Sequence, residues 1–340
     1  MADSAIRTII PLGFQWETTD PFLFCVHHED FYPEGNDDMG PNASLQGRDI
    51  GQDFVPKDGW RMYHGDRVPG FPRHPHRGFE TVTIVRRGFV DHTDSFGGVG
   101  RYGEGDVQWM TAGSGVQHAE MFPLLNKDSK NTAELFQIWL NLPKANKFAA
   151  PSYKMLWSEN IPVYTTEDST GKLIKITLAA GAIENKKAPS PPPDSWAANQ
   201  KNMIQIWTIE LDAGAVWTLP AAEAGLSRNL YYFLGSGLVA DGQEIPEYHR
   251  MELNSDRSVK LVNGNEVSQL LLLQGRPIQE PVVQYGPFVM NSREEIHQAF
   301  SDYQQTEFGG WPIPESDPVH PRDKGRFAKH PDGRVENPGA

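Results

Sequence analysis

Short apolar segments separated by turn residues dominate the stretch 70–141 and constrain the fold more than any other feature of the chain. Strands that recur at intervals of about 8 to 12 residues are typical of antiparallel sandwiches and barrels. In this stretch the strand-like segments are ETVTIVRRG, VQWMTAGSG and LFQIWLNLP. The pattern returns later in the chain as MIQIWTIEL, AVWTLP, NLYYFLG and VSQLLLLQG. We therefore predict an all-β protein whose two strand-rich halves share one architecture.

The chain is long enough to fold as two such halves, each with its own core. It has 340 residues, and its 32 glycines and 27 prolines favour a loop-rich β protein over a helical one. One helix is expected over about 293–304, because Ser292 can cap its start and Glu295 completes a capping box. The Pro-rich stretch 186–196 predicts a stiff loop. Residues 309–340 have little to bury and predict an extended or disordered tail.

Charge and apolar content argue against several classes of protein. The formal net charge of −13 disfavours sequence-independent nucleic-acid binding, which needs a basic face. No apolar run approaches the roughly 20 residues of a membrane helix, and the N-terminus lacks a signal-peptide pattern. Cys25 is the only cysteine, so no intrachain disulfide or thiolate zinc cluster can form, and its apolar neighbours predict an inert buried thiol. We expect a cytoplasmic protein that binds neither nucleic acid nor membrane.

Two pairs of polar residues offer metal ligands in strand context. His74 and His76 are one residue apart, and residues spaced in this way on a strand point to the same side. About forty residues later, His118 and Glu120 form a second pair of this kind. Imidazole nitrogens with a carboxylate suit Fe(II), Mn(II), Ni(II), Cu(II) or Zn(II) rather than Ca(II) or Mg(II). The two pairs together favour a metal site over a polar turn at His74–His76.

Spacing alone leaves the carboxylate ligand open. Glu80 lies four residues after His76, so an unbroken strand would place both on one face, whereas Glu120 stands beside His118. The two are nearly equal candidates. His92 is interpreted as a polar residue at a strand end that can also face the same cavity.

The motifs also resemble those of a known family. FPRHPHRGFETVTIV, GDVQWMTAGSGVQHAEM, FQIWLNLP and EPVVQYGPFVMNSREEIHQAFSDY are similar to segments of the pirin family of the cupin superfamily, from about Asp20 to about Phe308. The resemblance implies two cupin (jelly-roll type) β-barrels packed face to face, with the C-terminal helix in the second half. It implies one Fe(2+) ion per chain, or another divalent transition metal, and as its ligands His74, His76, His118 and Glu120. Glu80 then becomes a candidate for a residue that orients the metal ligands without binding the metal itself.

This resemblance sets the expected domain boundaries. Residues 1–150 would form the metal-binding barrel, 151–308 a metal-free barrel, and 309–340 the tail. The chain departs from shorter family members in a long insertion over 27–70, in the Pro-rich stretch and in the tail. Because the insertion ends next to His74, these departures put the substrate in doubt more than the metal.

The resemblance implies two classes of function. Some family members resemble quercetin 2,3-dioxygenases, in which O₂ cleaves a flavonol and carbon monoxide is released; here Glu120 would take the proton of the flavonol hydroxyl. The other class is a non-enzymatic, redox-sensing regulator that binds a protein partner through an iron-dependent surface. A metal-dependent enzyme with a different small aromatic substrate is a third reading. A monomer is expected. Five residues are candidates for an apolar wall of the cavity, although packing in the barrel core is the favoured interpretation of each: Phe79, Trp109, Met110, Phe122 and Phe136.

Overall fold

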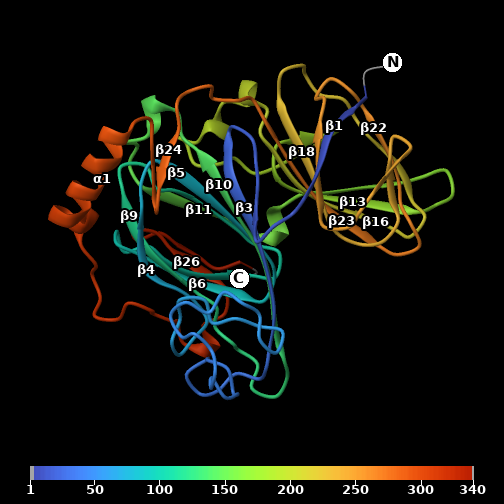
Figure 1. Ribbon diagram of the computed structural model, residues 1–340. Coiled ribbons are helices and arrows are strands. Elements are labelled where there is room, and N and C mark those ends of the chain that lie inside the picture. The colour runs from blue at the N-terminus through green and yellow to red at the C-terminus, as the bar shows by residue number, and fades with distance from the viewer. Residues whose placement is uncertain (1–3, 339–340) are drawn as a thin grey trace. The chain divides into compact units, whose positions relative to one another are not determined.

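A computed structural model describes residues 4–338 of the chain (Figure 1), which divide into two compact units. Unit 1 comprises the described residues up to Cys25 together with Asn160–Gln279. Unit 2 comprises Val26–Glu159 and the described residues from Glu280 onward. This division differs from the expected one, because the N-terminal strand groups with the second half of the chain and the C-terminal segment groups with the first.

Unit 1 consists of two main antiparallel sheets that share one hydrophobic core. The core draws residues from both sheets, for example Ile209, Leu230 and Leu270 from the larger and Leu238 and Leu261 from the smaller. The larger sheet has the order β1 (Ile6–Pro11), β21 (His249–Leu253), β18 (Ser227–Leu234), β23 (Ser268–Gly275), β16 (Gln205–Leu211), β13 (Leu173–Ala180), β12 (Val163–Glu167). The smaller has the order β17 (Val216–Leu219), β22 (Val259–Val262), β19 (Leu238–Ala240), β20 (Gln243–Ile245), and a hairpin joins β14 (Ala182–Ile183) to β15 (Lys186–Lys187).

The first strand explains why the N-terminus belongs to unit 1. Strand β1 pairs with β21 from the Ile6–Leu253 pair to the Pro11–His249 pair. An edge strand needs a partner for its backbone N–H and C=O groups, and β21 supplies it although some 240 residues lie between them. Such long-range pairing leaves no local signal in the sequence.

Unit 2 has the same plan. Its hydrophobic core takes side chains from both sheets, including Val85, Met110 and Leu135 from one and Val90 and Val116 from the other. One sheet has the order β11 (Ser152–Leu156), β8 (Val107–Thr111), β5 (Phe79–Arg87), β10 (Asn131–Asn141), β3 (Phe22–Tyr32), of which β3 belongs to unit 2 from Val26 onward. Strand β2 (Gln15–Trp16) lies among the residues of unit 1. The other has the order β27 (Val335–Glu336), β26 (Phe327–Lys329), β7 (Val99–Gly103), β6 (Phe89–Asp94), β9 (Val116–Met121), β4 (Gly70–His76).

The predicted helix is confirmed as α1 (Arg293–Thr306). The Ser292 hydroxyl accepts the Glu295 N–H at 3.2 Å, and the Glu295 carboxylate accepts the Ser292 N–H at 3.1 Å, so the predicted capping box is present. Helix α1 packs on a hairpin of β24 (Val283–Tyr285) and β25 (Phe288–Met290). Short 3₁₀ helices occur at Lys144–Asn146, Ser158–Asn160, Trp196–Ala198, Gln200–Asn202, Glu307–Gly309 and Arg322–Lys324. No helix within 4–338 combines the length and the apolar character needed to span a membrane.

The segment from Gly309 onward was expected to bury little, and here the structure differs. Strand β26 pairs with β7, and both Phe327 and Ala328 are buried. The anchor is polar: the buried Arg101 guanidinium donates to the carbonyl oxygens of His320 and Pro321 at 2.8 and 2.9 Å. A packed segment is usually predicted from a run of apolar residues. This segment is held by hydrogen bonds between backbone carbonyl groups and a guanidinium, so its sequence contains no such run.

Candidate metal centre

Two neighbouring antiparallel strands, β4 and β9, position the candidate ligands. His74 lies opposite His118 in the strand register, and His76 follows two residues later on β4. The register shifts between Phe71 and His74, an irregularity of the kind that re-aims side chains at functional sites. The local sequence therefore brings two histidines from one strand and one from its partner to the same side of the sheet.

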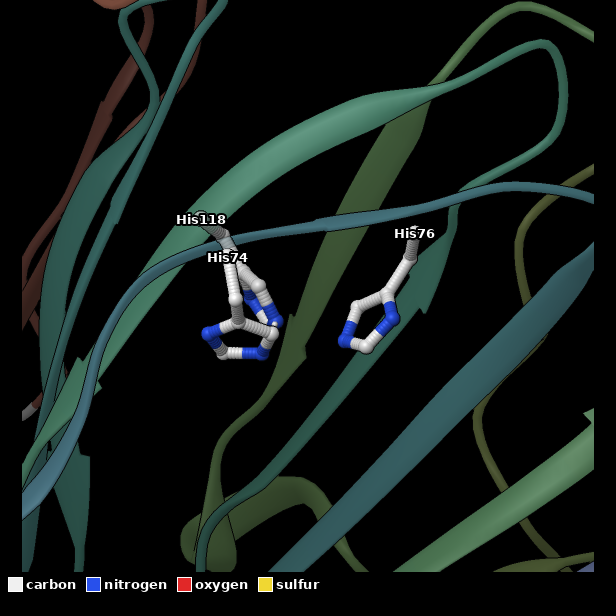
Figure 2. Close-up of side chains that lie close together, drawn as sticks. All are labelled: His74, His76 and His118. Carbon is white, nitrogen blue, oxygen red and sulfur yellow. Dashed lines mark hydrogen bonds between the residues drawn. The ribbon is translucent and has the colours of Figure 1, made fainter. Parts of the chain in front are cut away.

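The three imidazoles converge closely enough to share one ion (Figure 2). One ring nitrogen from each of His74, His76 and His118 lies within 4.8 Å of the others, and the Nε2 atoms of His74 and His118 are 3.0 Å apart. Imidazole nitrogens bind metals such as zinc at about 2.0–2.1 Å, so two that bind at right angles lie about 3 Å apart. The spacing of these side chains fits a bound transition metal.

Burial keeps the three rings uncharged at neutral pH. Desolvation lowers the pKa of His74 to about 4, although a hydrogen bond to the Pro72 carbonyl acts in the opposite direction. Desolvation also lowers the pKa values of His76 and His118 well below the usual range, and neighbouring imidazoles add to this effect. A neutral imidazole has a free lone pair, which is the form that binds a metal.

The tautomer of His74 follows from its backbone contact. Its Nδ1 lies 2.9 Å from the carbonyl oxygen of Pro72, which can only accept, so Nδ1 carries the proton and Nε2 carries the lone pair. That Nε2 is the atom that faces His118. A histidine oriented through its second nitrogen by a carbonyl group is a common arrangement at metal sites.

Glu120 lies beside this cluster without being part of it. Its Oε2 is 3.6 Å from the His118 Nε2, but the carboxylate is not within the distance that groups the three histidines. Gln137 donates to Oε2 at 2.9 Å and Thr83 donates to Oε1 at 3.3 Å. Burial raises the pKa of Glu120 above its ordinary value. The carboxylate is therefore held at the edge of the site by two donors.

Glu80, the rival carboxylate, faces elsewhere. Thr83 points toward Glu120, and residues an odd number of positions apart on a strand lie on opposite faces, so Glu80 lies on the other face of β5. Its Oε1 accepts hydrogen bonds from the Trp109 indole at 3.2 Å and the Thr111 hydroxyl at 2.7 Å. The unbroken strand assumed for its spacing does not exist, because β4 ends at His76 and Gly78, with φ +87°, turns the chain into β5.

His92 faces the site more directly than its interpretation as a strand-end residue implied. It pairs with Glu120 in the register of β6 and β9, and its ring centroid lies 5.6 Å from that of His118. The ring is fully buried, and its Nε2 lies 3.2 Å from Asp94 Oδ2. The i, i+2 spacing that identified the other pairs also applies here, because His92 and Asp94 are two residues apart on one strand. That spacing could have predicted that His92 faces the site.

Only part of the expected apolar wall adjoins the histidines. The ring centroid of Phe79 lies 5.1 Å from that of His76. Trp139, which the sequence analysis did not single out, lies 5.3 Å from His76 and 3.9 Å from Phe79. Phe136 instead stacks on His27 at 4.7 Å. Trp139 and Gln137 are two residues apart on β10 and therefore point to the same side of the sheet. This alternation along the strand could have predicted that Trp139 lies near the site.

Most of the chain is similar to proteins of one family. The description "Pirin" matches residues 8–140, and "Pirin C-terminal cupin domain" matches residues 206–309. A Pseudomonas aeruginosa protein named "Putative quercetin 2,3-dioxygenase" is 39% identical over 241 residues, covering 70% of this chain and 79% of that protein. Pirin of Mus musculus is 36% identical over 252 residues, covering 73% of this chain and 80% of that protein. A crystal structure of quercetin 2,3-dioxygenase from Acinetobacter baumannii has a TM-score of 0.69 at 26% identity, covering 90% of this chain and 98% of that one.

Proposed function

We propose that this chain, which belongs to the pirin family, is an iron-dependent dioxygenase that cleaves a flavonol or a similar small aromatic molecule. The observation that carries the proposal is the convergence of His74, His76 and His118, with their pKa values lowered by burial, beside the Glu120 carboxylate. The relatives named as quercetin 2,3-dioxygenases favour this chemistry over others that a cupin barrel can host.

The three histidines and Glu120 would hold the ion. A bound iron or similar divalent ion supplies Lewis acidity that lowers the pKa of a substrate hydroxyl, and access to O₂ chemistry. Because burial lowers the imidazole pKa values, the histidines are in the ligand form across the neutral range. Glu120 needs only a small movement toward the cluster, since its Oε2 is already 3.6 Å from His118 Nε2.

Glu120 would also act as the base. Its pKa is raised by burial, and a carboxylate whose pKa is closer to neutrality is a better proton acceptor than an exposed one. Gln137 and Thr83 fix its orientation through their hydrogen bonds, so the proton of a flavonol hydroxyl would be delivered to a positioned oxygen. Phe79 and Trp139 are buried aromatic residues beside His76 and would border the rings of such a substrate.

The test is a quercetin assay on protein of known metal content. The iron-loaded chain should consume O₂ and release carbon monoxide in step with loss of quercetin, and anaerobic samples should do neither. Glu120→Gln should retain O₂-dependent turnover at a rate reduced about 100-fold or more, because general-base catalysis typically contributes 10²–10⁴-fold. If iron-loaded protein binds quercetin but produces no carbon monoxide, the dioxygenase proposal fails.

A further inference from the structure

A groove in unit 2 runs between strand β24 and helix α1, which lie side by side (Figure 1). Its volume is about 620 Å³. From α1 it takes residues at i, i+3, i+4 and i+7, which form one face of a helix, and from β24 all three residues. The lining residues are Arg293, Ile296, His297, Phe300, Val283, Gln284 and Tyr285. None of them belongs to the candidate metal centre.

The floor of the groove is apolar and aromatic. Ile296 is buried, and the Phe300 ring packs edge-on against Phe288 at 4.8 Å and against Tyr285 at 5.6 Å. Tyr285 nevertheless remains 68% exposed. Sites for small ligands are concave, mainly apolar and about 300–1,000 Å³ in volume, so this groove has the size for one small molecule.

The rim carries the Arg293 guanidinium and the His297 imidazole, and both interact electrostatically with the exposed Glu294 carboxylate. The Arg293 guanidinium makes no hydrogen bond or salt bridge with any residue in the described part of the chain, and His297 is exposed beside it. Arg257, in unit 1, is the one other arginine within residues 4–338 whose side chain makes no hydrogen bond or salt bridge. A guanidinium whose N–H donors make no hydrogen bond presents a planar fork that suits a carboxylate or sulfonate.

We propose that this groove binds a small aromatic anion, in which a carboxylate or sulfonate is attached to a flat apolar body. The apolar body would lie on Ile296 and Phe300 with Tyr285 along its edge, and the anionic group would pair with Arg293. A peptide strand is a poorer match, because β24 offers an edge of only three residues. The groove is separate from the histidine cluster, and ligand binding there does not depend on the proposed dioxygenase activity.

The experiment uses 2-naphthoate as the probe and the uncharged 2-naphthamide as its matched analogue. The full chain is titrated calorimetrically in a His118→Ala background, so that the carboxylate cannot bind a metal at the histidine site. We expect one saturable naphthoate site per chain and at least tenfold weaker binding of the amide, because a hydrogen bond to a charged group typically has this effect. Equal affinity for acid and amide would overturn the proposal.

Variants on both walls identify the site. Arg293→Gln should weaken naphthoate binding about tenfold, whereas the matched Arg257→Gln should leave it within about twofold of the parent. Tyr285→Ala removes an exposed ring from the opposite wall and should weaken binding severalfold without affecting the fold. Naphthoate binding that is unchanged in both groove variants would overturn the assignment. So would an acidic peptide that binds in an Arg293-dependent way when naphthoate does not.

Discussion

At the scale of single residues, His118 is the side chain that links the parts of the candidate metal centre. It is fully buried, its Nε2 lies 3.0 Å from His74 Nε2, and the same nitrogen lies 3.6 Å from the Glu120 carboxylate. Its Nδ1 has no hydrogen-bond partner within the described residues. A buried polar nitrogen without a partner costs stability, so the position of this ring is better explained by ligand binding than by folding.

His118→Ala should therefore lose the metal and keep the fold. Elemental analysis of purified protein should find about one iron per chain in the parent and less than about a tenth of that in the variant, since losing one ligand typically costs far more than tenfold in affinity. Circular dichroism should show an unchanged strand signal. His249→Ala, a histidine of unit 1, serves as the control and should retain the parent metal content. An equal iron content in His118→Ala would refute the site assignment.

The two candidate carboxylates show what spacing could and could not decide. The i, i+2 spacing grouped His74 with His76, whose ring nitrogens lie together, and Glu120 with His118, whose Nε2 is 3.6 Å from Glu120 Oε2. The i+4 spacing of Glu80 required an unbroken strand, and Gly78 breaks it with a positive φ. A glycine is permitted to adopt that conformation but does not dictate it, so the turn could not be deduced from the residue alone.

At the scale of elements, a buried polar network joins strand β3 to the segment that contains Arg61 and Tyr63. The His28 Nδ1 lies 2.8 Å from the Tyr63 hydroxyl, which donates to Asp30 Oδ2 at 2.6 Å. Arg61 completes the network with two bonds to Asp30 at 2.9 and 3.2 Å. All four residues lie within 27–70, and the sequence alone did not predict a packed polar network there.

This network predicts a specific dependence of stability on pH. Burial, with smaller contributions from the nearby Arg61 and His27, lowers the pKa of His28 to about 3. Its pKa in the unfolded chain is about 6.5. Between these values the unfolded state binds a proton that the folded state does not. The stability due to His28 is therefore complete above about pH 6.5 and falls by about 1.4 kcal/mol per pH unit as the pH decreases.

His28→Asn removes the titrating group and keeps a polar atom near the Tyr63 hydroxyl. The free energy of unfolding of metal-free protein, measured in urea between about pH 7 and pH 4.5, should depend less on pH in the variant than in the parent. On acidification over that range, the parent should lose roughly 1–3 kcal/mol more than the variant. The other buried histidines contribute equally to both curves. Two parallel curves would show that His28 is not the group that loses its proton on folding.

At the scale of the whole molecule, the sequence predicted the architecture better than the assignment of segments to units. Two strand-rich halves were predicted from alternation and turns, and the match to a pirin C-terminal cupin domain agrees with two cupin domains. The grouping of β1 with unit 1 and of the C-terminal segment with unit 2 was not predicted. Both depend on pairings between residues more than 200 positions apart, and strand pairing has no local signature.

The C-terminal segment is bound to unit 2 by a buried ion pair, and this explains how its loss would act. Arg101 and Asp91 are fully buried and pair at 2.7 Å. The remaining Arg101 donors are satisfied by the carbonyl groups of His320 and Pro321, and Asp91 accepts the His320 N–H at 2.8 Å. A chain that ends at Val319 would keep the Arg101–Asp91 pair but leave the Arg101 donors and the Asp91 oxygen that bond to His320 and Pro321 unsatisfied, and it would uncover the edge of β7.

We expect such a truncated chain to lose stability, by about 1–3 kcal/mol for each buried group left unpaired, so that calorimetry finds the Tm of unit 2 lower by roughly 5–10 °C. A chain that ends at Glu336 keeps β26 and β27 and should melt like the parent. Because an apolar pair of similar shape can replace a buried ion pair at little cost, Arg101→Met with Asp91→Leu should restore part of the lost Tm in the truncated chain. A truncated chain with the parent Tm, or a double variant that destabilises it further, would show that the Arg101–Asp91 pair does not anchor the segment.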